Sequence, residues 1–315
     1  MNSPHWQQRI GWQRDWVWRG WQTRYTYMRA SQSNINTAPI ILLHGFGASV
    51  GHWRHNIPIL SQHHTVYALD LLGFGASRKA QANYSIHLWV EQVYDFWRTF
   101  IRQPAILVGN SIGSLVCVAA AASHPDMVQG MAMLSLPDIS LQQKAIPLWL
   151  RPLERGMKKL LAATPLPNTV FKIVRQPSVI RRWAGVAYVN QEAVNEELVE
   201  ILATPPQDED AVKAFSALFK GASNPQFAPS ATAILPALEI PMLLVWGRQD
   251  RFVPPHLAPM FARLNPKIEL VELDNAGHCP HDECPDQFNK ILLRWLESSL
   301  GEAKFLTPPQ VSRSN

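Results

Sequence analysis

The feature that most constrains the fold is a series of short, continuous apolar runs, each bounded by turn residues. Strands that are covered on both faces have such runs, whereas half-exposed strands alternate apolar and polar residues. Helical patterns lie between these runs or follow the last of them, at 86–100, 112–123 and 285–300. The alternation predicts an α/β domain with a mostly parallel sheet and helices on both faces. The predicted strands are 40–43, 66–69, 105–108, 131–134, 242–245 and 268–271.

The N-terminal segment has a different pattern, in which four tryptophans crowd into ten residues: Trp12, Trp16, Trp18 and Trp21. Their partial alternation around Arg19-Gly20 predicts two antiparallel strands joined by a tight turn. An antiparallel hairpin at the edge of a mostly parallel sheet is common. We expect the tryptophans to pack within this hairpin, and contact with a membrane is the alternative.

The alternation of strands and helices breaks between 135 and 231, in a stretch that is rich in proline and helical patterns. The stretch is too long for a loop. We therefore predict a mostly helical cap at 137–230, inserted into a core of 1–136 and 231–300, with a flexible tail at 301–315. Charges in the cap segregate, because 144–190 has nine basic residues against one acid and 191–210 has seven acids and no base.

The composition excludes some functional classes and leaves others open. The formal charge of +5 is too small to indicate a nucleic-acid partner, although it is compatible with an anionic membrane surface. Three cysteines without a CxxC pair predict no disulfide framework and a reducing compartment. The first residues lack a basic start followed by an apolar run, so we expect no secretory signal and a cytoplasmic protein.

The strongest chemical motif is Gly109-Asn110-Ser111-Ile112-Gly113, which lies between a buried strand and a small-residue helix. This context is the one that a nucleophile elbow requires. The turn holds the serine in a strained backbone conformation, and the small residues let helix and strand approach closely. We predict Ser111 as the nucleophile and the Ile112 N–H as a donor to the oxyanion.

A second glycine-rich loop, His44-Gly45-Phe46-Gly47, follows the strand at 40–43. Its glycines allow it to lie against the elbow, so the Phe46 N–H is the second predicted oxyanion donor. We expect His44 to shape this loop and not to act as the base.

An acid follows the strand at 242–245, in Trp246-Gly247-Arg248-Gln249-Asp250. In open α/β sheets, ligands bind outside the carboxyl ends of the strands. Asp250 there would hold a histidine in the correct tautomer and stabilise its charged form. The rival acids are Asp274 and Asp282.

The predicted base, His278, lies in a loop of small residues after the strand at 268–271. The order of serine, aspartate and histidine along the chain agrees with this fold. His281 is its rival. The cluster of His278, His281, Asp282, Glu283 and Cys284 looks metal-like, but we predict no metal and no organic cofactor, because its members have a simpler role in the loop and the following helix.

Together these four segments resemble the α/β-hydrolase family of the serine-nucleophile type over about 38–136 and 231–296. The resemblance implies the α/β-hydrolase fold with an inserted cap. Members of the family that are haloalkane dehalogenases or epoxide hydrolases use an aspartate nucleophile, so Ser111 argues against both activities.

Within the family, 277–283 together with 108–111 resembles pheophytinase and the related chlorophyll dephytylases of plants and cyanobacteria. Those enzymes hydrolyse the phytyl ester of chlorophyll pigments. This resemblance implies a hydrophobic ester as substrate, and it is compatible with peripheral contact at a thylakoid membrane.

The C–C bond hydrolases of meta-cleavage products are similar at 109–111, 246–248 and 250–254. This chain departs from them at His55, where they carry Asn two residues after a position equivalent to Trp53, and at Cys279, where they carry Trp. Asn110, Trp53 and His55 are the predicted substrate-pocket residues.

We therefore expect hydrolysis of a carboxylic ester through an acyl-enzyme, with the phytyl ester of chlorophyll or pheophytin as the candidate substrate. C–C bond hydrolysis and short-chain esterase activity are the alternatives. A catalytically silent fold that binds a hydrophobic ligand is the alternative from another class.

Overall fold

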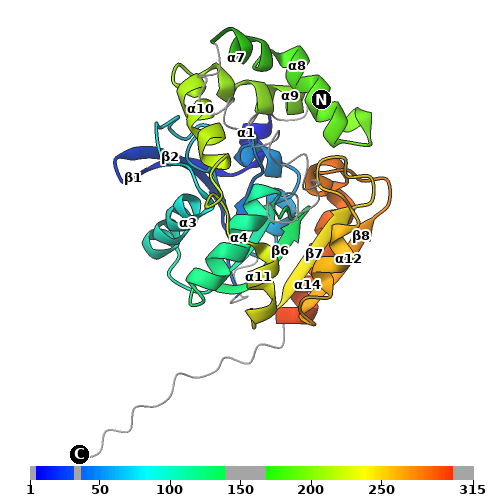
Figure 1. The fold of residues 1–315 in the computed structure, drawn as a ribbon. Helices are drawn as coiled ribbons and strands as arrows, with labels where there is room; N and C mark the ends of the chain where they lie inside the picture. Colours follow the sequence, from blue (N-terminus) through cyan, green and yellow to red (C-terminus); the bar gives the residue numbers. More distant parts are fainter. Residues whose placement is uncertain (1–4, 32–36, 139–167, 301–315) are drawn as a thin grey trace, which may run out of the picture.

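The computed structural model describes residues 5–31, 37–138 and 168–300. The predicted segment 301–315, and the cap residues between 139 and 167, lie outside the described residues. The fold is a central sheet with helices on both faces and a group of helices above one edge of it (Figure 1).

The sheet has eight strands in the order β1-β2-β4-β3-β5-β6-β7-β8. β1 and β2 are antiparallel to each other, β2 is antiparallel to β4, and the remaining pairs are parallel. The prediction of a mostly parallel sheet is confirmed, as is each of the six predicted strands. The strands are β1 Trp12–Trp18, β2 Trp21–Met28, β3 Ile40–Leu43, β4 Val66–Leu69, β5 Ala105–Asn110, β6 Val128–Leu134, β7 Met242–Gly247 and β8 Ile268–Leu273.

Helices outside the cap cover both faces of the sheet. The predicted helices at 86–100, 112–123 and 285–300 have the expected bounds. The described helices outside the insertion are α1 Trp6–Arg9, α2 Ile57–Leu60, α3 Ile86–Phe100, α4 Ile112–Ser123, α11 Ala231–Ile234, α12 Leu257–Ala262, α13 Pro280–Glu283 and α14 Pro285–Leu300, with short 3₁₀ turns η1 Val50–Trp53 and η4 Leu235–Ala237.

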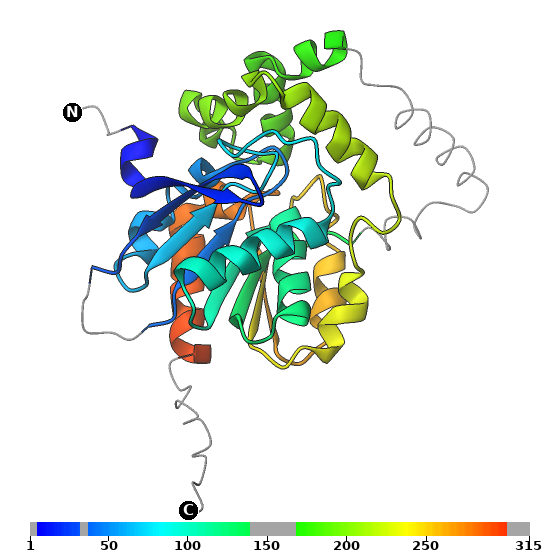
Figure 2. The same cartoon turned by 90° about the vertical axis from the view of Figure 1, so that its left-hand side faces the viewer.

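The central strands are apolar throughout because neighbouring residues of one strand face two different cores. In β3, Ile41 and Leu43 belong to the core on the side of α3 and α4, while Ile40 and Leu42 face the core that contains residues of α2 and α14. Successive side chains of a strand point to opposite faces. Helices lie on both sides of the sheet (Figure 2), and burial on both faces explains the continuous apolar runs.

The predicted N-terminal hairpin is present as β1 and β2. Arg19 and Gly20 both have positive φ, 51° and 83°, which is the conformation that two-residue hairpin turns favour. Trp18 is buried and Trp16 packs against Phe96 of α3, whereas Trp12 is 62% exposed on the edge strand. Most of the tryptophan cluster therefore serves packing.

Between β6 and β7 the described residues form only helices and short turns. α11 contacts α4 of the core, and the boundary at 231 stays a prediction. The elements of this insertion are α7 Asn168–Val174, α8 Pro177–Ala187, η2 Gln191–Ala193, α9 Glu196–Ala203, η3 Pro205–Gln207 and α10 Ala211–Ala222.

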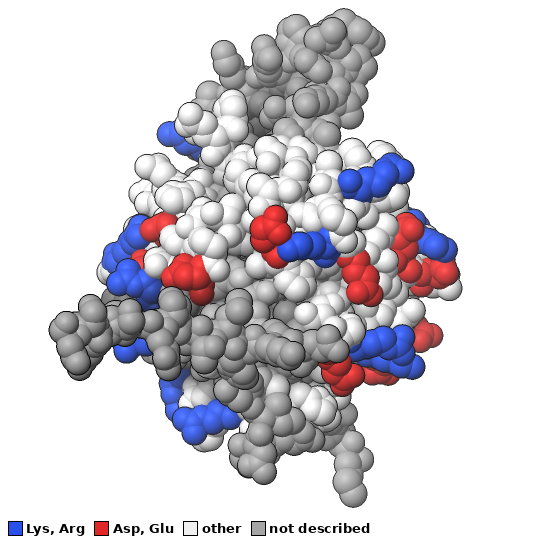
Figure 3. Space-filling model, turned by 90° about the horizontal axis from the view of Figure 1, so that it is seen from below, with Lys and Arg blue, Asp and Glu red and all other residues white. Residues whose placement is uncertain are grey.

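The surface away from this insertion carries charges of both signs, and Lys or Arg lies beside Asp or Glu around much of it (Figure 3). All three cysteines are free thiols. In the described ranges we find no helix that combines the length and the apolar character needed to cross a bilayer.

Candidate functional site

Ser111 lies at the junction of β5 and α4, in the strained conformation that the sequence predicted. Its φ is 55° and its ψ is −116°, a region that non-glycine residues rarely occupy. The Ser111 N–H donates to the Leu134 carbonyl at 2.9 Å, which ties the turn to β6. The serine is thereby held at the carboxyl edge of the sheet.

The glycines of this motif allow three backbones to meet. A Cβ on Gly113 would lie 2.3 Å from the carbonyl oxygen of Leu43, and a Cβ on Gly109 would lie 2.3 Å from the Gly113 backbone. Such distances are impossible for real side chains. The turn therefore packs directly on the end of β3, where the second glycine-rich loop begins.

That second loop reaches the serine, as its sequence predicted. A Cβ on Gly45 would lie 3.4 Å from the Ser111 Cβ, so the loop backbone passes next to the serine. His44 is fully buried, its Nδ1 lies 2.7 Å from the Gly45 carbonyl oxygen, and its Nε2 accepts from the Leu71 N–H at 3.1 Å. His44 thus shapes the loop, and burial lowers its pKa to about 4.

Asp250 and His278 form the predicted pair. Oδ2 of Asp250 lies 2.9 Å from Nδ1 of His278, and Oδ1 accepts from the N–H groups of Phe252 and Val253. Burial alone would raise the pKa of Asp250, but the bond to His278, its charge and the two N–H donors hold that pKa below its ordinary value. Asp250 is therefore an ionised acceptor for the imidazole.

The rival residues have other partners. The Asp274 side chain is 71% exposed and pairs with Arg248, while Asp282 binds Arg54 and Tyr188. His281 is fully buried, and neither of its ring nitrogens has a partner among the described residues. The structure thus distinguishes His278 and Asp250 from their sequence neighbours.

The loop of His278 is joined to the elbow through Asn110. Nδ2 of Asn110 donates to the His278 carbonyl at 3.0 Å, and the side chain is 1% exposed. Asn110 therefore holds the two candidate loops together. Its predicted role in the substrate pocket stays a prediction.

The insertion supports the same loop from the other side. The His278 N–H donates to the carbonyl of Ala187 at 2.8 Å, at the end of α8. The Glu283 carboxylate accepts three backbone N–H groups, from Val189, Asn190 and Gly277, at 2.5–2.6 Å. The segment after α8 and the histidine loop thus form one hydrogen-bonded unit, which we call the cap clamp.

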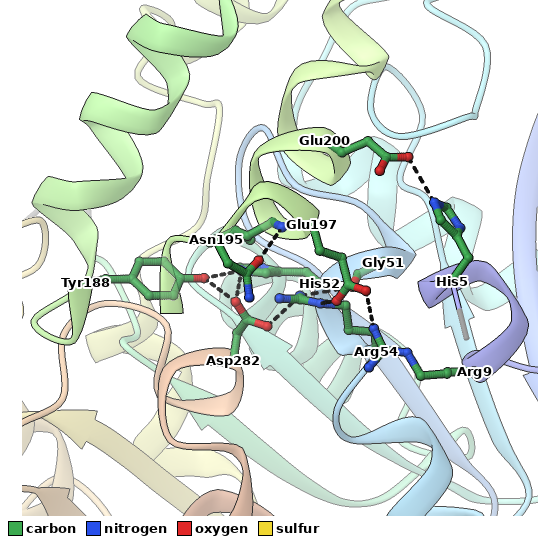
Figure 4. Close-up of polar contacts among 11 residues, drawn as sticks. His5, Arg9, Gly51, His52, Arg54, Tyr188, Asn195, Glu197, Glu200 and Asp282 are labelled. Atoms are coloured by element: carbon green, nitrogen blue, oxygen red, sulfur yellow. Dashed lines mark hydrogen bonds and ion pairs between the residues drawn. The ribbon is translucent and has the colours of Figure 1, made fainter. Parts of the chain in front are cut away.

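A buried ionic network continues the contact between insertion and core (Figure 4). Nη1 of Arg54 donates to Asp282 at 2.6 Å, and its Nε donates to Glu197 of α9 at 2.6 Å. The Tyr188 hydroxyl donates to Asp282 at 2.6 Å and lies 2.7 Å from Nε2 of His52. Arg9 of α1 also bonds to Glu197, so N-terminal helix, core and insertion meet here.

Trp53 and His55 lie in and beside this network. Trp53 is fully buried, and its ring packs against His281 with 4.2 Å between the ring centroids. The carbonyl of His55 accepts from Asn289 of α14. These contacts place Trp53 against α13 and His55 against α14, and their predicted pocket role stays a prediction.

Aromatic side chains flank the candidate site. Phe46 is 51% exposed and contacts Phe74 of the core and Phe215 and Phe219 of α10. The Phe252 ring packs edge-on against His278 with 5.3 Å between the centroids. The surroundings of the loops that carry Ser111 and His278 are therefore apolar.

Among the described residues, no group of three or more His, Cys, Asp or Glu side chains is arranged to hold a metal ion. Within the metal-like cluster, His278, Asp282 and Glu283 have the separate partners given above, and Cys284 is a free thiol.

Two supports of the site were missed by reasoning on the sequence: Arg54 and Tyr188. Glu283 was named there only as part of the loop and helix that follow His278, without its contacts to the insertion. The partners of Arg54 and Tyr188 are 228 and 94 residues away in the chain, so no local pattern reveals them.

The fold and these loops are those of an α/β hydrolase. The alpha/beta hydrolase fold family matches residues 38–285, and the chain belongs to this family. It is a hydrolase of the α/β fold.

Individual relatives are distant. Chloroplast pheophytinase of Arabidopsis thaliana is 25% identical over 87% of this chain, and this chain spans 64% of that protein's length. The 2-hydroxy-6-oxo-6-(2'-aminophenyl)hexa-2,4-dienoic acid hydrolase of Metapseudomonas resinovorans is 27% identical over 88% of each chain. A solved serine hydrolase involved in carbazole degradation superposes with a TM-score of 0.74, covering 91% of this chain and 98% of its own, at 21% identity. The relatives thus include both predicted subfamilies.

Proposed function

We propose that this chain is a serine hydrolase of carboxylic esters that acts through an acyl-enzyme. The observation that carries the proposal is the convergence of three loops: Ser111 in its strained turn, Gly45-Phe46 against it, and His278 paired with Asp250 at 2.9 Å. This is the arrangement of nucleophile, oxyanion donors and oriented base that acyl transfer needs.

In the proposed mechanism, the Ser111 Oγ attacks the ester carbonyl while His278 Nε2 accepts its proton. Asp250, ionised at neutral pH, holds the Nδ1 proton and stabilises the imidazolium. The N–H groups of Phe46 and Ile112 donate to the oxyanion. Ile112 is the first residue of α4, so its N–H has no acceptor within the helix.

His278 then gives its proton to the leaving alcohol, and the acyl group stays on Ser111. Water enters, His278 takes a proton from it, and the resulting hydroxide attacks the acyl carbon. Collapse of the second tetrahedral intermediate releases the acid, returns the proton to Ser111 and needs no cofactor.

The aromatic surroundings favour a hydrophobic ester. Phe46, Phe215 and Phe219 form one apolar group, and Phe252 packs against His278. The phytyl ester of chlorophyll or pheophytin is the substrate that the resemblance at 277–283 suggests, and the relative of that activity is 25% identical.

C–C bond hydrolysis of meta-cleavage products is the second candidate. The relative of 27% identity and Asn110 beside the nucleophile favour it. Cys279 in place of the Trp of those enzymes disfavours it, because a thiol removes a large aromatic wall next to the base.

The experiment is release of phytol from chlorophyll a and pheophytin a in detergent, with Ser111→Ala as control. A 4-nitrophenyl ester series from short to long acyl chains and a phenyl-substituted meta-cleavage product are assayed in parallel. Phytol from the wild type alone supports the pigment esterase. Turnover of the meta-cleavage product without any ester hydrolysis would contradict the proposed esterase and support C–C bond hydrolysis. Turnover of short esters alone would support an esterase but contradict chlorophyll or pheophytin as its substrate.

A further inference from the structure

The outer side of the insertion presents apolar side chains to solvent next to the candidate site. On α8, Trp183 is 59% and Val186 is 36% exposed, and on α7 Ile173 is 53% exposed. Phe252, which is 40% exposed, stacks on Trp183 with 6.5 Å between ring centroids. We call these four residues the apolar patch.

The orientation of α8 explains why the patch faces outward. Ala184 and Ala187 are buried against the insertion's own core, whereas Arg182, Trp183 and Val186 face solvent. A helix on the surface of a water-soluble domain normally turns its polar side outward. Here the large aromatic residue lies outside and the alanines lie inside, so the outer face suits a less polar neighbour than water.

The two helices that carry most of the patch are basic. From 168 to 187 the chain carries four basic residues and no acid: Lys172, Arg175, Arg181 and Arg182. Arg181 pairs with Glu196, but Lys172 and Arg182 are exposed and form no ion pair with a described residue. Their charge is thus available to an anionic partner. The opposite face of the molecule differs, because acids and bases lie side by side there (Figure 3).

We propose that α7, α8 and Phe252 form a docking surface for an anionic lipid layer. Such a layer offers negative headgroups to Lys172 and Arg182 and an apolar boundary to Trp183 and Ile173, and both components are needed for binding at an interface. Tryptophan is the residue that favours this boundary, since its ring is apolar and its N–H remains hydrated.

The position of the patch gives the docking surface a role in the reaction, and this role rests on the proposed function. Trp183 contacts Phe252, and Phe252 contacts His278. A hydrophobic ester that is dissolved in the lipid layer would therefore reach the base along an aromatic path without crossing bulk water. Docking itself does not depend on hydrolysis.

The test is co-sedimentation of the full chain with vesicles of phosphatidylcholine, with and without phosphatidylglycerol. It is made in the Ser111→Ala background, so that failure of the proposed hydrolysis does not affect the result. We expect binding to the anionic vesicles that weakens as salt is added.

Trp183→Ala is expected to lower the partition coefficient about tenfold, because the variant loses the free energy of burying one large aromatic side chain in the lipid layer. Lys172→Glu with Arg182→Glu is expected to lower it by at least as much and to reduce the salt dependence.

The matched control is Trp12→Ala, which removes an equally exposed tryptophan from the edge strand β1. We expect its partition coefficient to equal that of the parent. Absence of binding, equal binding to neutral vesicles, or an equal loss in Trp12→Ala and Trp183→Ala would overturn the docking surface. A change of oligomeric state in Trp183→Ala, seen by size-exclusion chromatography, without any vesicle binding would assign the patch to a protein partner instead.

Discussion

At the scale of single residues, the protonation state of Asp250 decides how His278 can act. Two backbone N–H groups and the imidazole satisfy the carboxylate, and its pKa is depressed although it is buried. An ionised acceptor at Nδ1 favours the tautomer with an unprotonated Nε2, which is the form that accepts the proton of Ser111 in the proposed mechanism.

We predict that Asp250→Asn lowers kcat by roughly 10³- to 10⁴-fold with little change in KM, because the amide favours the wrong tautomer of His278. The measurement is steady-state hydrolysis of the best ester from the panel. Asp274→Asn is the control, since Asp274 is exposed and pairs only with Arg248 among described residues. An equal loss of kcat in the two variants would contradict the proposed role of Asp250 in orienting His278.

The residues with local signals are the ones that the sequence revealed. Ser111, Asp250 and His278 each follow the end of a parallel strand in a short motif, and parallel strands bring their carboxyl ends to one edge. The structure brings His278 and Asp250 together at 2.9 Å, and their catalytic roles stay a prediction. Tyr188 and Arg54 act through partners far along the chain, and that kind of contact leaves no local pattern.

At the scale of elements, the cap clamp is the feature that joins two units. The end of α8 accepts the His278 N–H, and Glu283 of α13 accepts N–H groups from both the insertion and the histidine loop. The position of His278 therefore depends on the insertion as well as on the sheet.

We predict that Glu283→Gln lowers kcat by about tenfold or more with a smaller effect on KM, and also lowers the melting temperature. The glutamine amide has one acceptor oxygen, and its NH₂ group faces a backbone N–H that the second carboxylate oxygen accepted in the parent. At least one buried N–H therefore loses its acceptor, at a cost of about 1–3 kcal/mol. Steady-state kinetics and thermal unfolding measure the two effects.

The control for this change is Glu239→Gln, because the Glu239 side chain is 85% exposed and its carboxylate pairs with Lys267. A variant of Glu283 that loses stability but keeps its full kcat at a temperature where it is folded would show that the clamp is structural alone.

The elements themselves were largely predictable. The strands and the helices α3, α4 and α14 follow from apolar periodicity, because burial on both faces or on one helix face leaves a regular pattern. The way in which α8 and α9 sit on the core was not predictable, because it depends on the buried ionic network of Arg54, Asp282 and Glu197.

At the scale of the whole molecule, buried histidines set the response to acid. Burial lowers the pKa of His44 to about 4 and that of His52 to about 3, and it lowers the pKa of His281 far below the ordinary value. The unfolded chain binds protons at these residues below about pH 6.5, while the native state does not. Between that point and its native pKa, each such histidine therefore costs about 1.4 kcal/mol of stability per pH unit.

Asp70 opposes this trend in part. Burial raises its pKa to about 6, against which the Val50 and Ala76 N–H donors and nearby cations act. The native state thus takes up a proton there between about pH 6 and the ordinary pKa, which favours folding as the pH falls. Burial likewise raises the pKa of Asp282 and of Glu283, and it lowers that of His55 and of His64. Five histidines with a lowered pKa thus outnumber three carboxyls with a raised pKa, so we expect the melting temperature to fall from pH 6.5 toward pH 4.

We predict that His281→Phe reduces this acid sensitivity, because neither ring nitrogen has a described partner to lose. The measurement is the melting temperature of variant and wild type at about pH 5 and about pH 8. The variant should gain more at the lower pH. The larger ring beside Trp53 changes the melting temperature by a similar amount at both pH values. The test is therefore the change in melting temperature at about pH 5 compared with the change at about pH 8. His87→Phe, at an exposed position of α3, is the control for the exchange of a histidine for a phenylalanine. The same pH dependence in His281→Phe and wild type would contradict the assignment.

The proposed function requires Ser111 to be the nucleophile, and covalent labelling by a fluorophosphonate is the measurement that tests this role. The native wild type, the Ser111→Ala and His278→Ala variants, and heat-denatured wild type are treated alike, and the modified peptide is identified by mass spectrometry. We predict that the native wild type is labelled at Ser111, that His278→Ala reacts far more slowly, and that Ser111→Ala and the denatured protein do not react. Labelling of another residue, or undiminished labelling of Ser111→Ala, would contradict the account.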